Sequence, residues 1–147
     1  MRSLVALVAI GLLLPGVLAQ DAEIKNISQV DISKGVVVLD FMATWCGPCR
    51  SQMGELKKVK AQYGDKVRII SVDMDGRETK DMLANYKKEV GADWEFVIDD
   101  NGTYNTYKGR FLSGIPTLAI LKDGEKVYSH VGVTSSTDLA REIEKVL

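Results

Sequence analysis

The stretch Trp45-Cys46-Gly47-Pro48-Cys49 is the most informative part of this chain, because it holds the only two cysteines among 147 residues. A valine-rich apolar run at Val36–Met42 precedes it, and a helix-like stretch at Cys49–Tyr63 follows it. Two thiols this close can form one disulfide or supply two metal ligands. A closed zinc site needs four ligands, and His130 is the only histidine. A structural disulfide usually closes a long loop, so the short spacing favours redox chemistry.

The composition is that of one folded domain with a hydrophobic core. Hydrophobic residues make up 46% of the chain and charged residues 27%, and the formal net charge is −1. No basic surface indicates nucleic-acid binding, and no segment repeats at a solenoid period. We therefore expect a monomeric domain that does not bind nucleic acid.

The first nineteen residues differ from the rest, because Arg2 is their only charged side chain. An apolar run follows Arg2, is interrupted by Pro15-Gly16 and ends at Val17-Leu18-Ala19. This layout is typical of a secretory signal peptide. The alternative is an uncleaved membrane anchor, although a full span needs about 20 apolar residues. Either reading of residues 1–19 places the domain at 20–147 outside the cytoplasm, where disulfides persist.

The hydrophobic pattern predicts an α/β domain. The continuous apolar runs at Val36–Met42 and Val67–Val72 predict strands covered on both faces. Helices are expected at Cys49–Tyr63, with Pro48 in the first turn, and at Glu78–Val90. Other expected elements are a lead-in strand or turn at 21–31, a strand at 94–98, a helical turn at 103–108, a hairpin of 117–121 and 126–131, and a last helix after Ser135-Ser136. This order predicts a mixed sheet flanked by helices.

Four separated features together resemble the thioredoxin superfamily. They are Asp40-Phe41, the Trp45–Cys49 motif, Gly114-Ile115-Pro116-Thr117 and Val131-Gly132. The resemblance covers residues 30–147 and implies a thioredoxin fold. The segment Gly76–Phe111 carries an extra helix and strand before the proline. This insertion resembles the exported TlpA/ResA-like thiol:disulfide oxidoreductases.

The two cysteines are expected to have unequal roles. Cys46 precedes the helix, so the unpaired N–H groups and the helix dipole should stabilise its thiolate as the nucleophile. Cys49 lies one turn inside the helix and suits the resolving role. The resemblance implies that Asp40 accepts the proton of Cys49, through water, and burial should raise the pKa of Asp40. The alternative for Asp40 is a strand-end carboxylate that faces solvent.

The resemblance also implies a surface for an extended substrate. Pro116 would be cis and face the disulfide, leaving the backbone of Ile115 able to pair with a substrate strand. Trp45 would shield the disulfide, or else pack in the core, and Gly132 would permit close approach, or else be a plain turn glycine. The expected substrate-binding residues are Trp45, Gly47, Pro48, Ile115, Pro116 and Gly132.

These observations predict an exported thiol:disulfide oxidoreductase that uses the Cys46–Cys49 pair, without a cofactor or metal. Its partners would be protein thiols and disulfides outside the cytoplasm. The Gly47-Pro48 pair resembles that of reducing thioredoxins, so we expect a reductant supplied by a membrane electron donor. The alternatives are a disulfide oxidant or isomerase, and a copper carrier of related fold. Such a carrier would have three residues between its cysteines and a usable histidine.

Overall fold

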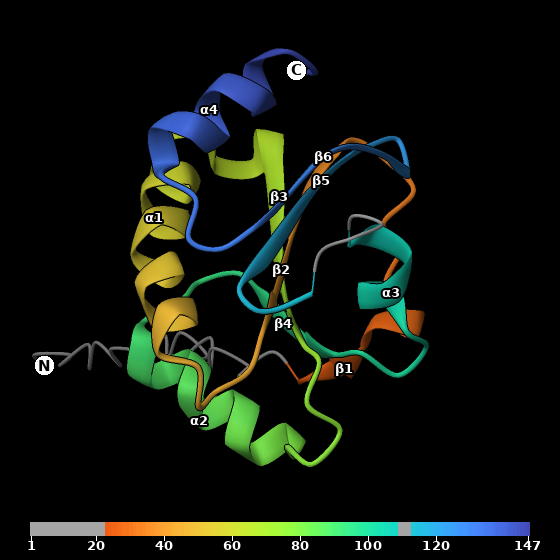
Figure 1. The fold of residues 1–147 in the computed structure, drawn as a ribbon, viewed down its shortest axis with the longest axis vertical. Helices are drawn as coiled ribbons and strands as arrows, with labels where there is room; N and C mark the ends of the chain where they lie inside the picture. The colour runs from red at the N-terminus through yellow and green to blue at the C-terminus, as the bar shows by residue number, and fades with distance from the viewer. Residues whose placement is uncertain (1–22, 109–112) are drawn as a thin grey trace, which may run out of the picture.

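The computed structural model describes residues 23–108 and 113–147, so the expected leader at 1–19 lies outside the described residues. Six strands form one sheet in the order β1-β4-β3-β2-β5-β6 (Figure 1). The strands are β1 (Lys25–Asn26), β2 (Val36–Met42), β3 (Val67–Asp73), β4 (Glu95–Ile98), β5 (Thr117–Lys122) and β6 (Glu125–Val131). The helices are α1 (Gly47–Tyr63), α2 (Lys80–Val90), α3 (Thr103–Tyr107) and α4 (Ser136–Glu144).

The sheet is mixed, as the sequence predicts. Strand β2 pairs in parallel with β3 and antiparallel with β5. Strand β4 adds in parallel to β3, with α2 as the crossover between them, and β6 forms the hairpin with β5. The unit α2–β4 is the helix and strand expected within the insertion, and it widens the sheet beyond β3.

Helices cover both faces of the sheet. One apolar cluster packs α1, α2 and α4 against the sheet, through residues such as Leu56, Leu83 and Leu139. The other cluster lies on the opposite face, where Tyr104 of α3 packs edge-on against Phe41, with ring centroids 5.4 Å apart. Figure 1 shows α3 on the far side of the sheet from α1 and α2. Every residue of β2 is buried, which explains its continuous apolar sequence.

Two helices begin where capping groups place them rather than where the apolar pattern begins. Helix α1 starts at Gly47, two residues before the expected start, because Cys46 is its N-cap and Pro48 fits its first turn. Helix α2 starts at Lys80 rather than Glu78, because the Thr79 hydroxyl accepts the N–H of Met82 at 3.2 Å. The end of α2 at Val90 is as predicted, whereas α3 ends one residue early, at Tyr107, and α4 ends at Glu144, before the end of the chain.

Across residues 23–108 and 113–147, no helix combines the length and the apolar character needed to cross a bilayer.

Candidate active site

Cys46 and Cys49 form a disulfide at the amino-terminal end of α1, with Cα atoms 5.2 Å apart. Cys46 is 5% exposed, whereas Cys49 is completely buried. The backbone N–H of Cys49 donates to Cys46 Sγ at 3.2 Å. After reduction this N–H and the helix dipole stabilise a thiolate on Cys46. The geometry therefore supports the predicted order, in which Cys46 attacks and Cys49 resolves.

The loop before β5 faces the disulfide. The Ile115–Pro116 peptide is cis, as the resemblance implies. The carbonyl oxygen of Ile115 lies 3.8 Å from Cys46 Sγ. Gly132 has a φ of +101° and donates its N–H to the Pro116 oxygen at 2.8 Å. The end of β6 is thus held against the cis-proline loop by a glycine whose backbone conformation other residues rarely adopt.

Trp45 lies on the surface beside the disulfide, so the core-packing alternative for this residue is wrong. The side chain is 64% exposed, and its indole N–H donates to Asp75 Oδ2 at 2.8 Å. The same carboxylate pairs with Arg77, at 2.7 Å between Nη2 and Oδ2. Hydrogen bonds from Arg77 and then Trp45 hold the pKa of Asp75 well below its usual range. The indole is therefore tethered rather than free to rotate.

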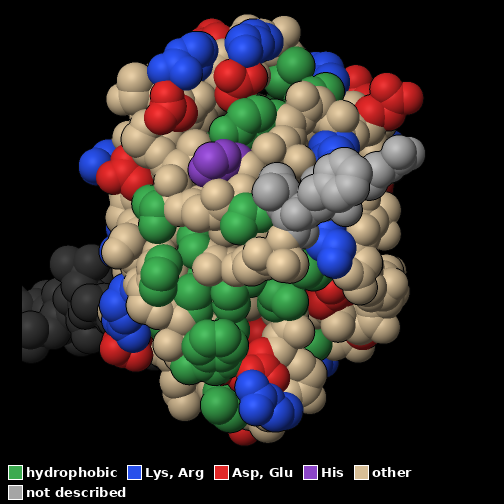
Figure 2. All heavy atoms as spheres, viewed as in Figure 1, with side chains coloured by type: hydrophobic (Ala, Val, Ile, Leu, Met, Phe, Trp, Pro, Cys, Tyr) green, Lys and Arg blue, Asp and Glu red, His purple; other side chains and the backbone are tan. Residues whose placement is uncertain are grey.

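A shallow apolar pocket of about 250 Å³ lies between Trp45 and the cis-proline loop. Figure 2 shows hydrophobic side chains gathered on the face in view. The lining residues are Ala43, Trp45, Met74, Asp75, Gly76, Gly114 and Ile115. Two other expected contact residues, Gly47 and Pro48, are exposed in the first turn of α1. All six expected substrate-binding residues thus lie around one end of α1, the cis-proline loop and the end of β6.

Carboxylates link the loop after β2 to the loop after β3. Glu78 accepts the backbone N–H of Thr44 at 3.0 Å, and also the Thr44 hydroxyl. Asp73 is 1% exposed, and its Oδ2 has no hydrogen-bond partner. Burial, opposed by the N–H of Asp75 and aided by the charge of Glu78, raises the pKa of Asp73 to about 7. The Thr44–Glu78 contacts hold the loop that carries Trp45 against the loop after β3.

Asp40 is completely buried on β2, so the solvent-facing alternative is wrong. Val38 and Met42, its period-two neighbours, belong to the apolar cluster that contains Cys49. The Asp40 side chain therefore points to the Cys49 side of the sheet. Asp40 Oδ2 accepts the Ser71 hydroxyl at 2.8 Å, and Oδ1 has no partner. Burial raises the pKa of Asp40 to about 7, although the Ser71 hydrogen bond opposes that rise.

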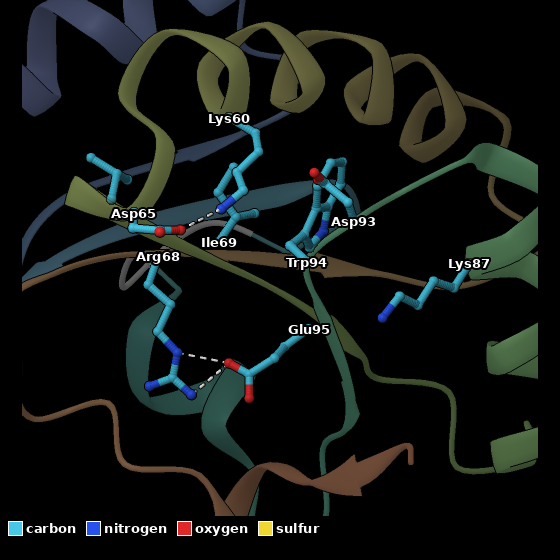
Figure 3. Close-up of a pocket in the computed structure, with 9 residues that line it drawn as sticks. Lys60, Asp65, Arg68, Ile69, Lys87, Asp93, Trp94 and Glu95 are labelled. Atoms are coloured by element: carbon cyan, nitrogen blue, oxygen red, sulfur yellow. Dashed lines mark hydrogen bonds and ion pairs between the residues drawn. The ribbon is translucent and has the colours of Figure 1, made fainter. Parts of the chain in front are cut away.

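A larger pocket, of about 420 Å³, lies at the opposite end of β3 from the disulfide (Figure 3). Its charged side chains largely satisfy one another. Lys60 pairs with Asp65 at 3.2 Å, and Arg68 pairs with Glu95 at 2.5 Å. Size alone therefore does not make this pocket the active site.

Sequence reasoning missed the residues that support the site from β3 and the loop after it. They are Asp73, Asp75 and Glu78. Ser71 is not among them, because the resemblance already placed it near Asp40. A signal for the three carboxylates was present, because the carboxyl ends of neighbouring parallel strands lie at the same edge of a sheet. Trp45 follows β2 as Asp75 follows β3, so their contact was open to prediction.

The fold, together with a buried cysteine pair whose first member is the N-cap of α1, defines a thiol:disulfide oxidoreductase with a thioredoxin fold. The family model described as thioredoxin matches residues 18–109. Thioredoxin of Bacillus subtilis (strain 168) is 31% identical over 117 residues, which cover 80% of this chain and 88% of that protein. The chain belongs to the thioredoxin family.

Two further comparisons also match most of this chain. Thiol-disulfide oxidoreductase ResA of Bacillus cereus is 29% identical over 138 residues, covering 90% of this chain and 75% of that protein. The crystal structure of StoA from Bacillus subtilis superposes with a TM-score of 0.63 at 21% identity, covering 81% of this chain and 92% of that one. The likeness to StoA is one of fold.

Proposed function

We propose that this protein acts outside the cytoplasm and reduces disulfides in other proteins, through the dithiol form of Cys46 and Cys49. The single observation that carries the proposal is the placement of Cys46. Its sulfur caps α1, accepts the N–H of Cys49 and lies 3.8 Å from the backbone of Ile115. A nucleophile and a strand-pairing backbone thus meet at one point.

The reaction begins with the Cys46 thiolate, which attacks one sulfur of a substrate disulfide. A mixed disulfide forms between Cys46 and the substrate, and the second substrate sulfur leaves as a thiolate. Cys49 then loses its proton and attacks Cys46 Sγ. The Cys46–Cys49 disulfide forms and the first substrate sulfur leaves. Two electrons have passed from the protein to the substrate.

Asp40 is the base in the second step. Its carboxyl points to the side of the sheet where Cys49 is buried, and burial raises its pKa to about 7. A base with a pKa near neutrality can take a proton at physiological pH and return it afterwards. The water that would link the two groups has a polar atom to bind, because Asp40 Oδ1 lacks a partner.

The substrate would bind as an extended chain beside Ile115, with backbone hydrogen bonds to the cis-proline loop. An apolar side chain next to the substrate cysteine would enter the pocket formed by Trp45, Met74 and Ile115. Gly132 keeps the other side of this path free of a side chain. A polypeptide with an apolar residue near its disulfide is thus the favoured substrate class.

The location outside the cytoplasm is supported by the sequence of residues 1–19, which has the layout of a signal peptide or anchor. An oxidising compartment does not regenerate a dithiol. The reductant role therefore requires an electron donor in the membrane. The Gly47-Pro48 pair resembles the one between the cysteines of reducing thioredoxins, which supports electron flow from this protein to its substrate.

The test has two arms. The first is reduction of a protein disulfide such as that of insulin, which Cys46→Ser should abolish, while Cys49→Ser should accumulate mixed disulfides. The second is the reduction potential of the pair in glutathione buffers. A reduction potential of about −270 mV, the value of thioredoxin, supports the reductant role. A potential of about −120 mV, the value of a strong oxidant, contradicts that role.

A further inference from the structure

A chain of two hydrogen bonds leads from Trp94, just before the inserted strand β4, to the buried carboxylate of Asp40. The indole N–H of Trp94 donates to Ser71 Oγ at 3.0 Å. The Ser71 hydroxyl donates to Asp40 Oδ2 at 2.8 Å. Asp40 and Ser71 are completely buried and Trp94 is 5% exposed. Water therefore does not compete for these contacts.

The chemistry of the three groups gives this chain one direction. An indole N–H can only donate, so Ser71 Oγ must be the acceptor of that bond. The single proton of the Ser71 hydroxyl is then left for Asp40 Oδ2. A proton on Asp40 cannot leave through these two hydrogen bonds, because the indole at the end of the chain does not accept a proton. Asp40 Oδ1, which has no partner, is the oxygen that remains to gain and lose a proton.

We propose that Ser71 and Trp94 are positioning residues for the thiol–disulfide exchange, which hold Asp40 through Oδ2 and so assign the proton exchange with Cys49 to Oδ1. The proposal rests on the proposed function, in which Asp40 serves Cys49. It also gives the insertion a role in the chemistry. Trp94 directly precedes β4, the inserted strand, so the insertion supplies an N–H to the support of the base.

The surrounding structure holds both residues in place. Ser71 is the residue that β3 pairs with Asp40 of β2. The Trp94 ring stacks on Phe96, with centroids 6.1 Å apart and planes at 24°. The rest of the ring borders the pocket of Figure 3, at the end of β3 away from the disulfide. Packing thus fixes the donor independently of the active-site loops.

Other groups face this side of the sheet from the elements packed on it. Helix α1 contributes the cysteine pair, and α2 contributes Tyr86, whose buried hydroxyl has no partner. Burial raises the pKa of Tyr86, Arg50 opposes that rise, and the charge of Asp40 adds to it. Strand β3 contributes Asp73, two residues beyond Ser71 on the same face, and burial raises its pKa to about 7 as well. Strand β5 contributes the apolar Leu118 opposite Asp40. The experiment therefore follows the Asp40 carboxyl itself.

The test measures the pH midpoint of the Asp40 carboxyl by infrared spectroscopy, with Asp40→Asn identifying the band. In Ser71→Ala the midpoint should rise by about one to two pH units, because a charge-assisted hydrogen bond to the ionised form is lost. In Trp94→Phe it should rise by up to about half a unit, because the remaining bond loses its polarising neighbour. Ser71→Thr keeps the hydroxyl and should restore the wild-type midpoint.

The same midpoints should appear in the pH profile of the step in which Cys49 resolves a mixed disulfide. Ser129→Ala on β6 is the matched control and should change neither midpoint. Unchanged midpoints in both Ser71→Ala and Trp94→Phe would overturn the inference, even if these variants lose stability. The proposed function fails by different results, namely a Cys46→Ser protein that still reduces the substrate or an oxidant-like potential, and the base role of Asp40 fails if Asp40→Asn leaves the pH profile unchanged.

Discussion

Replacing Asp40 with asparagine should stabilise the folded protein at pH 8 and have much less effect at pH 4.5. The substitution keeps the shape of the side chain and removes its charge. Asp40 is completely buried, so at pH 8 its ionised carboxylate lies in the fold, away from bulk water. The change in stability should therefore depend on pH.

The sign and size follow from the pKa of the carboxyl. Burial raises the folded-state value from 3.8 to about 7, against the opposing Ser71 hydrogen bond. Between these pH values the folded protein holds a proton that the unfolded chain has lost, so its stability falls as the pH rises from about 4 to 7. Integrating over this shift, the gap between Asp40→Asn and wild type should widen by about 3 kcal/mol from pH 4.5 to pH 8.

Urea unfolding of the oxidised proteins at both pH values measures this gap. With an m-value of roughly 1.5 kcal/mol/M, the difference between the two midpoints should grow by about 2 M urea. Asp93→Asn, which removes a carboxylate from an exposed position before β4, is the control for the loss of one charge. An unpaired amide in the Asn variant shifts both measurements together and cancels in the comparison.

A gap that is the same at pH 4.5 and pH 8 would refute this reasoning. It would mean that the Asp40 carboxyl titrates alike in the folded and unfolded chain, and so lacks the raised pKa that a base for Cys49 requires. A gap that widens in the opposite direction would mean that the folded protein stabilises the ionised form.

Three further changes test single features around the disulfide. Trp45→Ala should lower kcat/KM for a protein disulfide about tenfold. The thermal midpoint should barely change, because the side chain is 64% exposed. A parallel loss of kcat/KM and thermal stability would contradict a role in substrate binding. Gly132→Val places a branched side chain at a φ of +101°. The free energy of unfolding in urea should fall by about 1–3 kcal/mol, and KM should rise. Wild-type values of both quantities would argue against close approach of the substrate to Gly132. Glu78→Gln removes a negative charge that helps raise the pKa of Asp73, so carbon NMR should find the Asp73 carboxyl titrating at lower pH. An unchanged titration midpoint would show that the charge of Glu78 does not affect the pKa of Asp73.

The sequence determined the arrangement of elements and the reactive pair. Strand β2 was predicted with its observed bounds, Val36–Met42, because a strand buried on both faces has a continuous apolar sequence. The end of α1 at Tyr63 and the hairpin of β5 and β6 were also predicted from local sequence patterns. The roles proposed for Cys46 and Cys49 rest on their positions at a helix start.

Only the tertiary structure decided which side chains support that pair. The contact of Asp40 with Ser71 depends on the register of β2 against β3, and a shift of one residue would turn Ser71 to the other face. Trp94 reaches Ser71 only because β4 is added beside β3. Local patterns state which face of an element is apolar, but they do not state which polar atoms meet across separate elements. That pairing is set by packing of the whole sheet, and here it decides how Asp40, the proposed base behind the Trp45–Cys49 motif, is held.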